Sequence, residues 1–312
     1  MVVSNLSMDN YKNFNHIKIH TQYSICEGAL RINDLAEFCK KNKIKCVGLS
    51  DTTNLCGALE FSENLSKIGT QPIIGTQVNF KFADQIGLLP LIATSEESYK
   101  SIIEMSSNSY LKNDSMSEPH CNFKDLSAVS KDIIILSGTV NGLVGKLFDK
   151  GLFNEIEEIY KFLKKSINDN FYIEIQRHND HNEKLFEEFN LEISKKLDIP
   201  IIATNEVFYL DKEMYEAHDA LICIGNKTYI NEKNRLKYSN QHYLKSDEEM
   251  KEIFSDLPEA LENNYNLFYK CKFKPGSSKP VLPNISSDKG GDADQNLIDD
   301  STTCLNEKLL KI

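Results

Sequence analysis

The chain has 312 residues, 40% of them hydrophobic, and its 36 basic residues stand against 46 acidic ones, giving a net charge of −10. Length and composition suit a soluble protein with one large α/β domain or two smaller ones. The acidic balance disfavours tight, sequence-independent binding to nucleic-acid phosphates. The N-terminus lacks a signal peptide's basic start, and no segment has the roughly 20 apolar residues that cross a bilayer. We therefore expect a cytoplasmic protein that does not bind membranes.

Eight cysteines are spread along the chain, and none of them forms a C-x-x-C pair with another. Zinc knuckles need closely spaced thiolates, and disulfide frameworks belong to oxidising compartments. Free cysteine otherwise behaves as a small buried hydrophobic residue. The pattern indicates reduced, mostly buried thiols.

Short apolar runs alternate with helical patterns from residue 14 onward. Strands are predicted over 14–20, 45–50, 72–80, 88–94, 132–138, 171–176 and 200–205, and helices over 31–43, 55–68, 95–108, 141–149, 153–166, 180–197 and 212–224. The spacings Thr94-x-x-Glu97 and Ser246-x-x-Glu249 are typical of capping boxes at helix starts. Mostly apolar strands that are each followed by a helix predict a parallel sheet with helices outside, and their number favours a TIM-like β/α barrel.

The composition changes at about residue 274, where KPGSSKPVLPNISSDKGGDADQN begins. A stretch so rich in Pro, Gly, Ser and Asp is typical of an extended connector. We therefore expect a tail over 1–13, a barrel over 14–273, a linker over 274–293 and the opening of a further region over 294–312. The apolar residues of that last segment have loosely helical spacing and need a partner surface for stability.

The stretch FNHIKIHTQYS, residues 14–24, places polar side chains on one face of the first predicted strand. Alternation along a strand points His16, Lys18 and His20 to the same side. Two imidazoles at this spacing suit a metal cluster, but the lysine between them offers a positive charge where a cation would need a lone pair.

Polar residues also stand at the carboxyl ends of other predicted strands, where a parallel barrel carries its functional face. They are Ser50, Asp51, Gln77, the stretch from Glu174 to His178, Asn205 and Glu206. Because these strand ends converge in a barrel, we interpret the residues as a present or former site.

Seven stretches of the sequence together resemble one known family. They are HIKIHTQYS (16–24), GLSDTTNLCGALEF (48–61), QPIIGTQV (71–78), LSGTVNGLVGKL (136–147), IEIQRH (173–178), PIIATNEVFYL (200–210) and KPVLPN (279–284). In order and spacing they resemble the PHP domain at the N-terminus of the bacterial replicative DNA polymerase III alpha subunits. The resemblance runs from about residue 14 to the end of the chain. It implies a PHP-type (β/α)7 barrel, in agreement with the independent prediction of a TIM-like barrel.

The resemblance also implies where a metal centre would lie. In active relatives, histidines and acids hold up to three divalent ions, and a metal-bound hydroxide attacks a phosphoester. The matching positions here are Lys18, His20, Glu27, Thr52, Gln77, Leu88, His178, Glu206 and Phe208. Lysine is cationic, leucine and phenylalanine carry no donor atom, and threonine and glutamine are weak substitutes for histidine and an acid. We expect vestigial positions with no catalytic residue and no bound metal, since only His20, Glu27, His178 and Glu206 could still ligate one.

Electrostatics gives the same expectation for Lys18. An ammonium roughly 4 Å from a dication would be repelled by about 8 kcal/mol at an effective dielectric constant near 20. Lys18 and a bound metal therefore exclude each other. We predict that the Lys18 ammonium takes the cation position and pairs with Glu27, Glu206 or Asp51.

The function that the resemblance implies is that of a non-catalytic structural and docking module. Its partners would be the proofreading exonuclease and other replicase subunits, with DNA met only through the polymerase region. DNA synthesis needs paired aspartates that bind two Mg²⁺ ions in a palm domain, and no such constellation occurs in these residues. Residues 290–312 resemble the lead into that palm.

Two alternatives remain open at this point. One is a metal-dependent phosphoesterase or 3′-to-5′ exonuclease of the same family, using Zn²⁺ or Mn²⁺ on the four remaining ligands. The other is a small-molecule phosphatase of histidine biosynthesis, a group that shares the fold but lacks the long motifs at 48–61 and 136–147.

Overall fold

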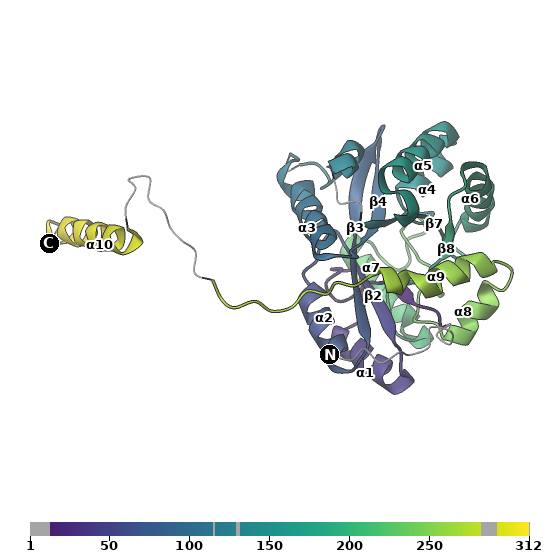
Figure 1. Cartoon of the computed structure of the whole chain (residues 1–312), viewed down its shortest axis with the longest axis horizontal. Coiled ribbons are helices and arrows are strands. Elements are labelled where there is room, and N and C mark those ends of the chain that lie inside the picture. Colours follow the sequence, from purple (N-terminus) through teal and green to yellow (C-terminus); the bar gives the residue numbers. More distant parts are fainter. Residues whose placement is uncertain (1–12, 115, 129–131, 282–291, 312) are drawn as a thin grey trace. The chain divides into compact units, whose positions relative to one another are not determined.

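The computed structural model describes residues 13–114, 116–128, 132–281 and 292–311 (Figure 1). The chain forms two compact units, of which the first ends at Gly276 and the second covers Ser277–Ile312. Apart from Asn13, the predicted N-terminal tail lies outside the described residues. None of the helices in these ranges combines the length and apolar character of a membrane span.

The first unit alternates strands and helices much as the sequence predicts. Its elements begin with β1 (His16–Ile19), α1 (Ile32–Asn42), β2 (Cys46–Thr52), α2 (Ala58–Lys67), β3 (Gln71–Phe82), β4 (Gln85–Ile92), α3 (Glu96–Leu111), β5 (Cys121–Asn122) and the 3₁₀ helix η2 (Phe123–Ala128). They continue with β6 (Ile134–Leu136), α4 (Leu143–Asp149), α5 (Phe153–Ile167), η3 (Asn168–Asn170), β7 (Phe171–Ile175), α6 (Glu183–Leu197), β8 (Ile201–Ala203) and β9 (Glu206–Val207). The last are η4 (Lys212–Met214), α7 (Tyr215–Asn226), α8 (Asp247–Ile253) and α9 (Pro258–Lys270).

The strands form one curled sheet in the order β8-β7-β6-β4-β3-β2-β1-β9, with β5 beside β3. The two ends of this order, β8 and β9, are separated in the chain only by Thr204 and Asn205. The sheet therefore curls back toward its own beginning, and the helices lie around its outside (Figure 1). This arrangement confirms the TIM-like α/β fold.

The prediction of a wholly parallel sheet is wrong at one strand. β4 runs antiparallel to both of its neighbours, β3 and β6. Only Ala83 and Asp84 separate β3 from β4, and Ala83 takes a positive φ of 50°. A connection of two residues makes a hairpin, whereas a parallel crossover needs a dozen residues or more.

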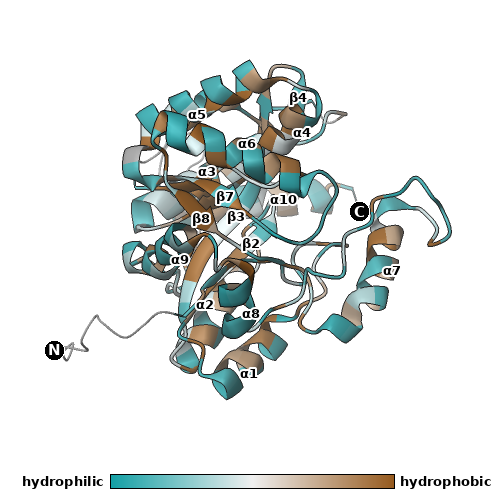
Figure 2. Cartoon of the chain, turned by 90° about the vertical axis from the view of Figure 1, so that its right-hand side faces the viewer, coloured by the Kyte–Doolittle hydropathy of each residue, from teal (hydrophilic) through white to brown (hydrophobic). Residues whose placement is uncertain are grey.

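Period-two alternation along β1 separates its apolar side chains from its polar ones. Ile19 packs in a cluster with Leu35 of α1 and Phe61 of α2, and Ile17 packs in another with Leu267 of α9. Lys18 therefore points to the opposite side of the strand. Figure 2 shows the result for the whole sheet, in which brown strands lie beneath helices of mixed colour.

The longer helices of the first unit bury an apolar stripe, as the spacing of their hydrophobic residues predicts. In α5 the buried residues recur at intervals of three and four, at Ile156, Ile159, Tyr160, Leu163 and Ile167. At the start of α8 the predicted capping box is confirmed, because Glu249 N donates to Ser246 Oγ and Ser246 N donates to Glu249 Oε2.

The capping box predicted at Thr94 and Glu97 is wrong by one residue. The N-cap of α3 is Ser95, which forms its reciprocal bonds with Ser98. Thr94 Oγ1 instead donates to the carbonyl of Asp132 at 2.5 Å. A serine at the third helical position replaces the glutamate of the usual motif here, so the S/T-x-x-E spacing does not identify this cap.

The second unit contains α10 (Ala293–Leu309), whose N-cap Asp292 accepts a hydrogen bond from the backbone of Asp294. The apolar side chains of this unit are exposed: Leu297, Ile298, Leu305, Leu309 and Leu310. Residues 271–281 form neither helix nor strand, and 282–291 of the predicted linker lie outside the described residues.

Candidate functional site

Five buried side chains that four strands position lie next to one another, and we call them the mouth cluster. They are Lys18 of β1, His20 just after β1, Gln77 of β3, Glu174 of β7 and Glu206 of β9. All five residues are at least nine-tenths buried. All five were singled out in the sequence as polar residues in or just after predicted strands, and the sheet brings them together although they are far apart in sequence.

The Lys18 ammonium lies between two carboxylates. Its Nζ is 3.2 Å from Glu174 Oε1 and 3.2 Å from Glu206 Oε1, and its side chain is 1% exposed. The predicted pairing with Glu206 is therefore confirmed. Glu174 is a partner that the sequence prediction missed, although an acid inside the apolar strand FYIEI was a signal for a buried polar contact.

The second oxygen of Glu174 differs from the first. Oε1 receives hydrogen bonds from Gln176 Nε2 at 2.8 Å and from the Thr204 hydroxyl. Oε2 has no hydrogen-bond partner among the described residues. The Lys18 ammonium thus lies next to the same oxygen, Oε1, that accepts the hydrogen bonds from Gln176 and Thr204.

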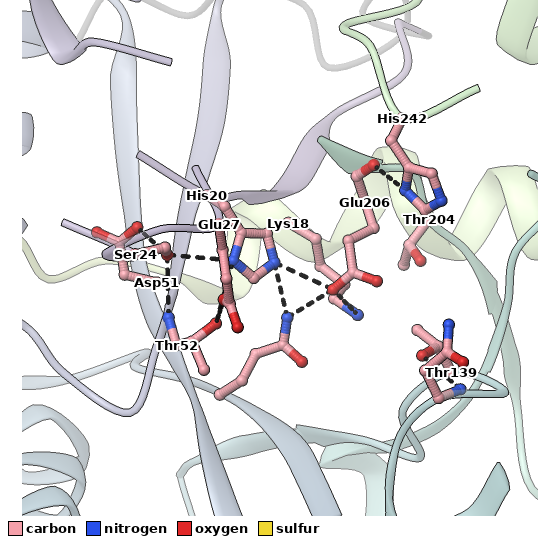
Figure 3. A network of polar contacts seen from close by, with 12 residues as sticks. Lys18, His20, Ser24, Glu27, Asp51, Thr52, Thr139, Thr204, Glu206 and His242 are labelled. Atoms are coloured by element: carbon pink, nitrogen blue, oxygen red, sulfur yellow. Dashed lines mark hydrogen bonds and ion pairs between the residues drawn. The ribbon is translucent and has the colours of Figure 1, made fainter. Parts of the chain in front are cut away.

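His20 connects Glu206 to the rest of the cluster (Figure 3). Its Nε2 is 3.0 Å from Glu206 Oε1 and 2.9 Å from Gln77 Nε2. Gln77 Nε2 also donates to Glu206 Oε1 at 2.6 Å. Glu206 Oε1 therefore faces an ammonium, an imidazole and an amide at once, which leaves this oxygen no free direction for a metal ion.

The charges of the cluster stabilise one another against burial. Burial alone would lower the pKa of the Lys18 ammonium, but Glu174 and Glu206 reverse the effect and hold it above its ordinary value. Burial would likewise raise the pKa of Glu206, but Lys18, with the bonds from His20 and Gln77, holds it well below its ordinary value. Both groups therefore remain charged inside the barrel at neutral pH.

Asp51 and Glu27, the two other acids named as alternative partners for Lys18, are engaged elsewhere. Asp51 accepts hydrogen bonds from Thr21 N at 2.7 Å, from Thr21 Oγ1 at 2.8 Å and from Ser24 Oγ at 2.7 Å. Glu27 accepts one from Thr52 Oγ1 at 2.5 Å. These acids fix the loop that follows β1, because that loop would otherwise leave backbone and hydroxyl donors unpaired.

Thr52 stands beside the cluster without joining the ion pairs. Besides its bond to Glu27, its Oγ1 lies 3.4 Å from His20 Nδ1, which is also 3.2 Å from Ser24 Oγ. Figure 3 shows this row of hydroxyls on the side of His20 that faces away from Glu206. Both nitrogens of the imidazole therefore have polar neighbours.

His178 belongs to a second group of polar side chains next to the mouth cluster. Its ring stacks on His242 with centroids 4.1 Å apart, and its Nε2 is 3.0 Å from Asn205 Oδ1. His242 Nε2 in turn lies 3.2 Å from Asp180 Oδ2. Burial, then the neighbouring His242 and Lys245, hold the pKa of His178 well below its ordinary value. The sequence offered no signal for this stacked pair, since the two residues belong to separate loops.

The two apolar positions of the predicted set lie apart from each other. The Phe208 ring packs 4.4 Å from the ring of His20, centroid to centroid, and closes one side of the mouth cluster. Leu88 lies in β4, directly opposite Asn79 of β3, whereas Gln77 lies opposite Pro90. The structure therefore brings Phe208 to the cluster and gives Leu88 a place in the hairpin.

The residues at these positions do not fit a centre of several divalent ions. Among the described residues, no group of three or more His, Cys, Asp and Glu side chains is arranged to hold a metal. At the point where donors converge, the Lys18 ammonium already neutralises the carboxylates at 3.2 Å. An ion there would have to displace a buried lysine charge.

A comparison of the sequence with known protein families gives a match. The family model of the PHP domain matches residues 16–178 of the chain. The chain belongs to the PHP domain family. The matched range starts within β1 and ends at His178, so the PHP match includes Lys18, His20, Gln77 and Glu174 of the mouth cluster, and Glu206 lies beyond it.

Curated PHP relatives are much longer than this chain. It is 36% identical over 288 residues to the DNA polymerase III subunit alpha of Rickettsia conorii, covering 90% of this chain and 24% of that protein. It is 31% identical over 286 residues to that of Caulobacter vibrioides, covering 89% and 25%. The chain thus spans about a quarter of the length of the relatives it matches, and it is homologous to their N-terminal region.

A solved structure with a similar fold is a two-domain protein from Bacteroides vulgatus that contains a predicted PHP-like metal-dependent phosphoesterase. The two share 10% sequence identity and a TM-score of 0.40, over 76% of this chain and 62% of that one.

Proposed function

We propose that this PHP barrel is a non-catalytic structural and docking module of a DNA polymerase III alpha subunit. DNA synthesis, with its Mg²⁺ ions, would belong to other parts of such a polypeptide. The barrel would stabilise the subunit and offer surfaces to other replicase proteins, among them the proofreading exonuclease. We further propose boundaries of 14–273 for the barrel, 274–293 for a linker and 294–312 for the start of the polymerase region.

The observation that carries this proposal is the Lys18 ammonium, 3.2 Å from both Glu174 and Glu206. Metal-activated hydrolysis needs a cation that binds water and lowers its pKa, and lysine can hold the same carboxylates together but activates no water. The cluster therefore keeps the structural effect of a cation and loses its chemistry. Buried charge pairs of this kind are strongly coupled, and removing one partner destabilises the fold.

The experiment that tests the proposal combines elemental analysis with an assay of hydrolysis. The purified chain is dialysed against Zn²⁺ or Mn²⁺, and its bound metal is measured by mass spectrometry. Hydrolysis of a labelled DNA single strand and of p-nitrophenyl phosphate is then followed with the same ions. We expect less than stoichiometric metal and no hydrolysis beyond that of the His178→Ala variant.

The opposite result would favour a working phosphoesterase or 3′-to-5′ exonuclease. Stoichiometric metal, together with hydrolysis that the His178→Ala substitution abolishes, would overturn the proposal. Lys18→Ala provides an informative second variant, because it removes the competing charge. If that variant alone acquires metal, the lysine is the group that excludes the ion.

A further inference from the structure

The end of α7 and the segment after it expose large apolar side chains to solvent. We call residues 224–237, the last three residues of α7 and the loop that follows, the α7 loop. Among its side chains, Ile224 is 70% exposed, Tyr229 is 78% exposed and Ile230 is 58% exposed. Leu236 is 46% exposed. Single exposed apolar residues are ordinary, but four within fourteen consecutive residues are typical of an interaction surface.

Arg235 holds the α7 loop in a defined conformation. Its guanidinium donates to both oxygens of Asp219 in α7, at 2.6 and 2.7 Å, and its side chain is only 4% exposed. It also donates to the carbonyls of Ile230 and Leu236, each at 3.2 Å. The loop is therefore ordered with its apolar side chains facing outward, and a preordered surface loses less conformational entropy when it binds.

The α7 loop also contacts the loop that follows β1. A Cβ placed on Gly225 would come within 2.6 Å of the Cβ of Cys26, so this close approach requires glycine. Next to Cys26 stands Ile25, which is 82% exposed. The contact between Gly225 and Cys26 thus joins the segment of Ile25 to that of Ile224. Figure 2 shows α7 at the edge of the molecule, beside long stretches that are neither helix nor strand.

The charge of the α7 loop is opposite to that of the chain. It contains four basic residues, Lys227, Lys233, Arg235 and Lys237, and one acidic residue, Glu232, whereas the whole chain has a net charge of −10. Arg235 is neutralised by Asp219, so the three lysines and Glu232 leave an excess of two positive charges around the apolar side chains. Such a surface is complementary to an acidic partner with apolar residues.

We infer that the α7 loop, with Ile25, is a docking site for an acidic, aliphatic segment of a partner protein. This inference rests on the proposed function, and it specifies where a partner of the barrel binds. Aliphatic side chains gain free energy when a protein surface buries them, whereas a nucleic-acid strand offers phosphates and base faces. A chain with an excess of ten negative charges would also repel such a strand beyond this loop.

The test measures binding of the purified proofreading exonuclease subunit to the whole chain by isothermal titration calorimetry. The key variant carries Tyr229→Ser and Ile230→Ser, and a second carries Lys233→Glu. The control is Leu111→Ser, which removes an apolar side chain that is 81% exposed at the end of α3. We expect the double variant to bind about tenfold or more weakly. The Lys233→Glu variant should bind more weakly with a reduced salt dependence, and the control should bind like the parent chain.

The outcomes separate the two proposals. If the parent chain binds the exonuclease and the α7 loop variants bind equally well, the partner docks elsewhere, and only this inference is overturned. If the parent chain does not bind at all, the docking function proposed above fails and this inference fails with it. If the variants lose affinity for a labelled DNA single strand but keep the exonuclease, the loop is a nucleic-acid surface, which also overturns the inference.

Thermal melts accompany each titration. Because Tyr229 and Ile230 are exposed, their substitution should leave the melting temperature of the chain unchanged. A loss of binding with an unchanged melt then reports on the surface and not on folding.

Discussion

The mouth cluster buries charged side chains, whereas the α7 loop exposes apolar ones. In the mouth cluster, charged groups are withdrawn from water and paired with one another, as Lys18 is with Glu174 and Glu206. In the α7 loop, a buried arginine holds the backbone so that apolar side chains face the solvent. The first region contains the residue types of a reactive site, but its charged groups contact one another. The second contains the residue types of a protein core, but they are exposed to solvent.

This difference separates stability from recognition. Buried charges that pair with one another make the fold depend on both partners. Exposed apolar side chains contribute little to folding, and they are available to a partner. Changes in the mouth cluster should therefore alter stability, whereas changes in the α7 loop should alter binding or local order.

The largest effect is expected from removing the Lys18 charge. Lys18→Met leaves the carboxylates of Glu174 and Glu206 buried without the ammonium between them, since the two lie at 0% and 9% side-chain exposure. Breaking a buried pair on one side costs about 3–5 kcal/mol. We expect a loss of this size in the free energy of unfolding, measured by urea denaturation at neutral pH.

Two further variants show whether that loss comes from the ion pairs. Lys100→Met removes a lysine whose side chain is 70% exposed, and its unfolding curve should match that of the parent. Combining Lys18→Met with Glu174→Gln should recover part of the stability, because one unpaired charge is then absent. Equal losses for Lys18→Met and Lys100→Met would contradict the role assigned to the buried ammonium.

Acidification should lower the free energy of unfolding, because two buried histidines, His218 and His16, resist protonation in the folded chain. His218 of α7 lies 2.9 Å from the carbonyl of Glu27 through its Nε2, and its ring stacks on Phe208 beside the mouth cluster. Burial lowers the pKa of His218 from 6.5 to about 4, although its hydrogen bond to Glu27 acts in the opposite direction. Burial likewise lowers the pKa of His16 to about 4.

The direction of this pH effect depends on whether the folded or the unfolded chain binds protons more readily. Between pH 6.5 and about 4 the unfolded chain protonates these two histidines more readily than the folded chain does. Their contribution is therefore fully present above pH 6.5, and it falls by up to about 1.4 kcal/mol per pH unit for each histidine. Glu183 opposes this loss, because burial raises its pKa to about 6, and its contribution is present at low pH and lost as the pH rises from 4.5.

Urea denaturation at pH 7 and pH 5 measures this effect. The parent chain should lose stability on acidification, and His218→Gln should lose less of it, because one of the buried histidines is then absent. An equal loss in both proteins would show that the ring of His218 is not protonated on unfolding.

The smallest effect is expected from Arg235, and it should be local. Arg235→Ala removes the bidentate bond to Asp219 and the two bonds to the loop carbonyls. Amide hydrogen exchange over 227–236 should then accelerate by about tenfold, while exchange in β1 and β2 stays as it was. An unchanged exchange rate in the α7 loop would contradict the idea that Arg235 orders it.

Much of the fold could be predicted from the sequence because its signals are local. The apolar runs marked the strands, and the spacing of apolar residues marked helices such as α5. The strand β4 was predicted, but its antiparallel direction was missed, although the predicted strands 72–80 and 88–94 stand too close in sequence for a parallel crossover. The shift of the α3 cap to Ser95 was missed because a serine replaced the expected glutamate.

The site could be predicted only in part, for a different reason. Residue types were enough to foresee that Lys18 needs a carboxylate, and Glu206 provides one. That Lys18 pairs with Glu174 and not with Asp51 depends on the register of β7 relative to β6 and β8 in the curled sheet. A single sequence does not determine that register. The stacking of His178 on His242 likewise depends on two loops that meet only in three dimensions.

The most direct test of the central claim is anomalous diffraction from crystals of the chain soaked in Mn²⁺ or Zn²⁺. We predict that Lys18 Nζ remains in contact with Glu174 and Glu206, and that no anomalous peak lies among the side chains of the mouth cluster. Two or more metal peaks ligated by His20, Glu206 and their neighbours, with the lysine displaced, would contradict it.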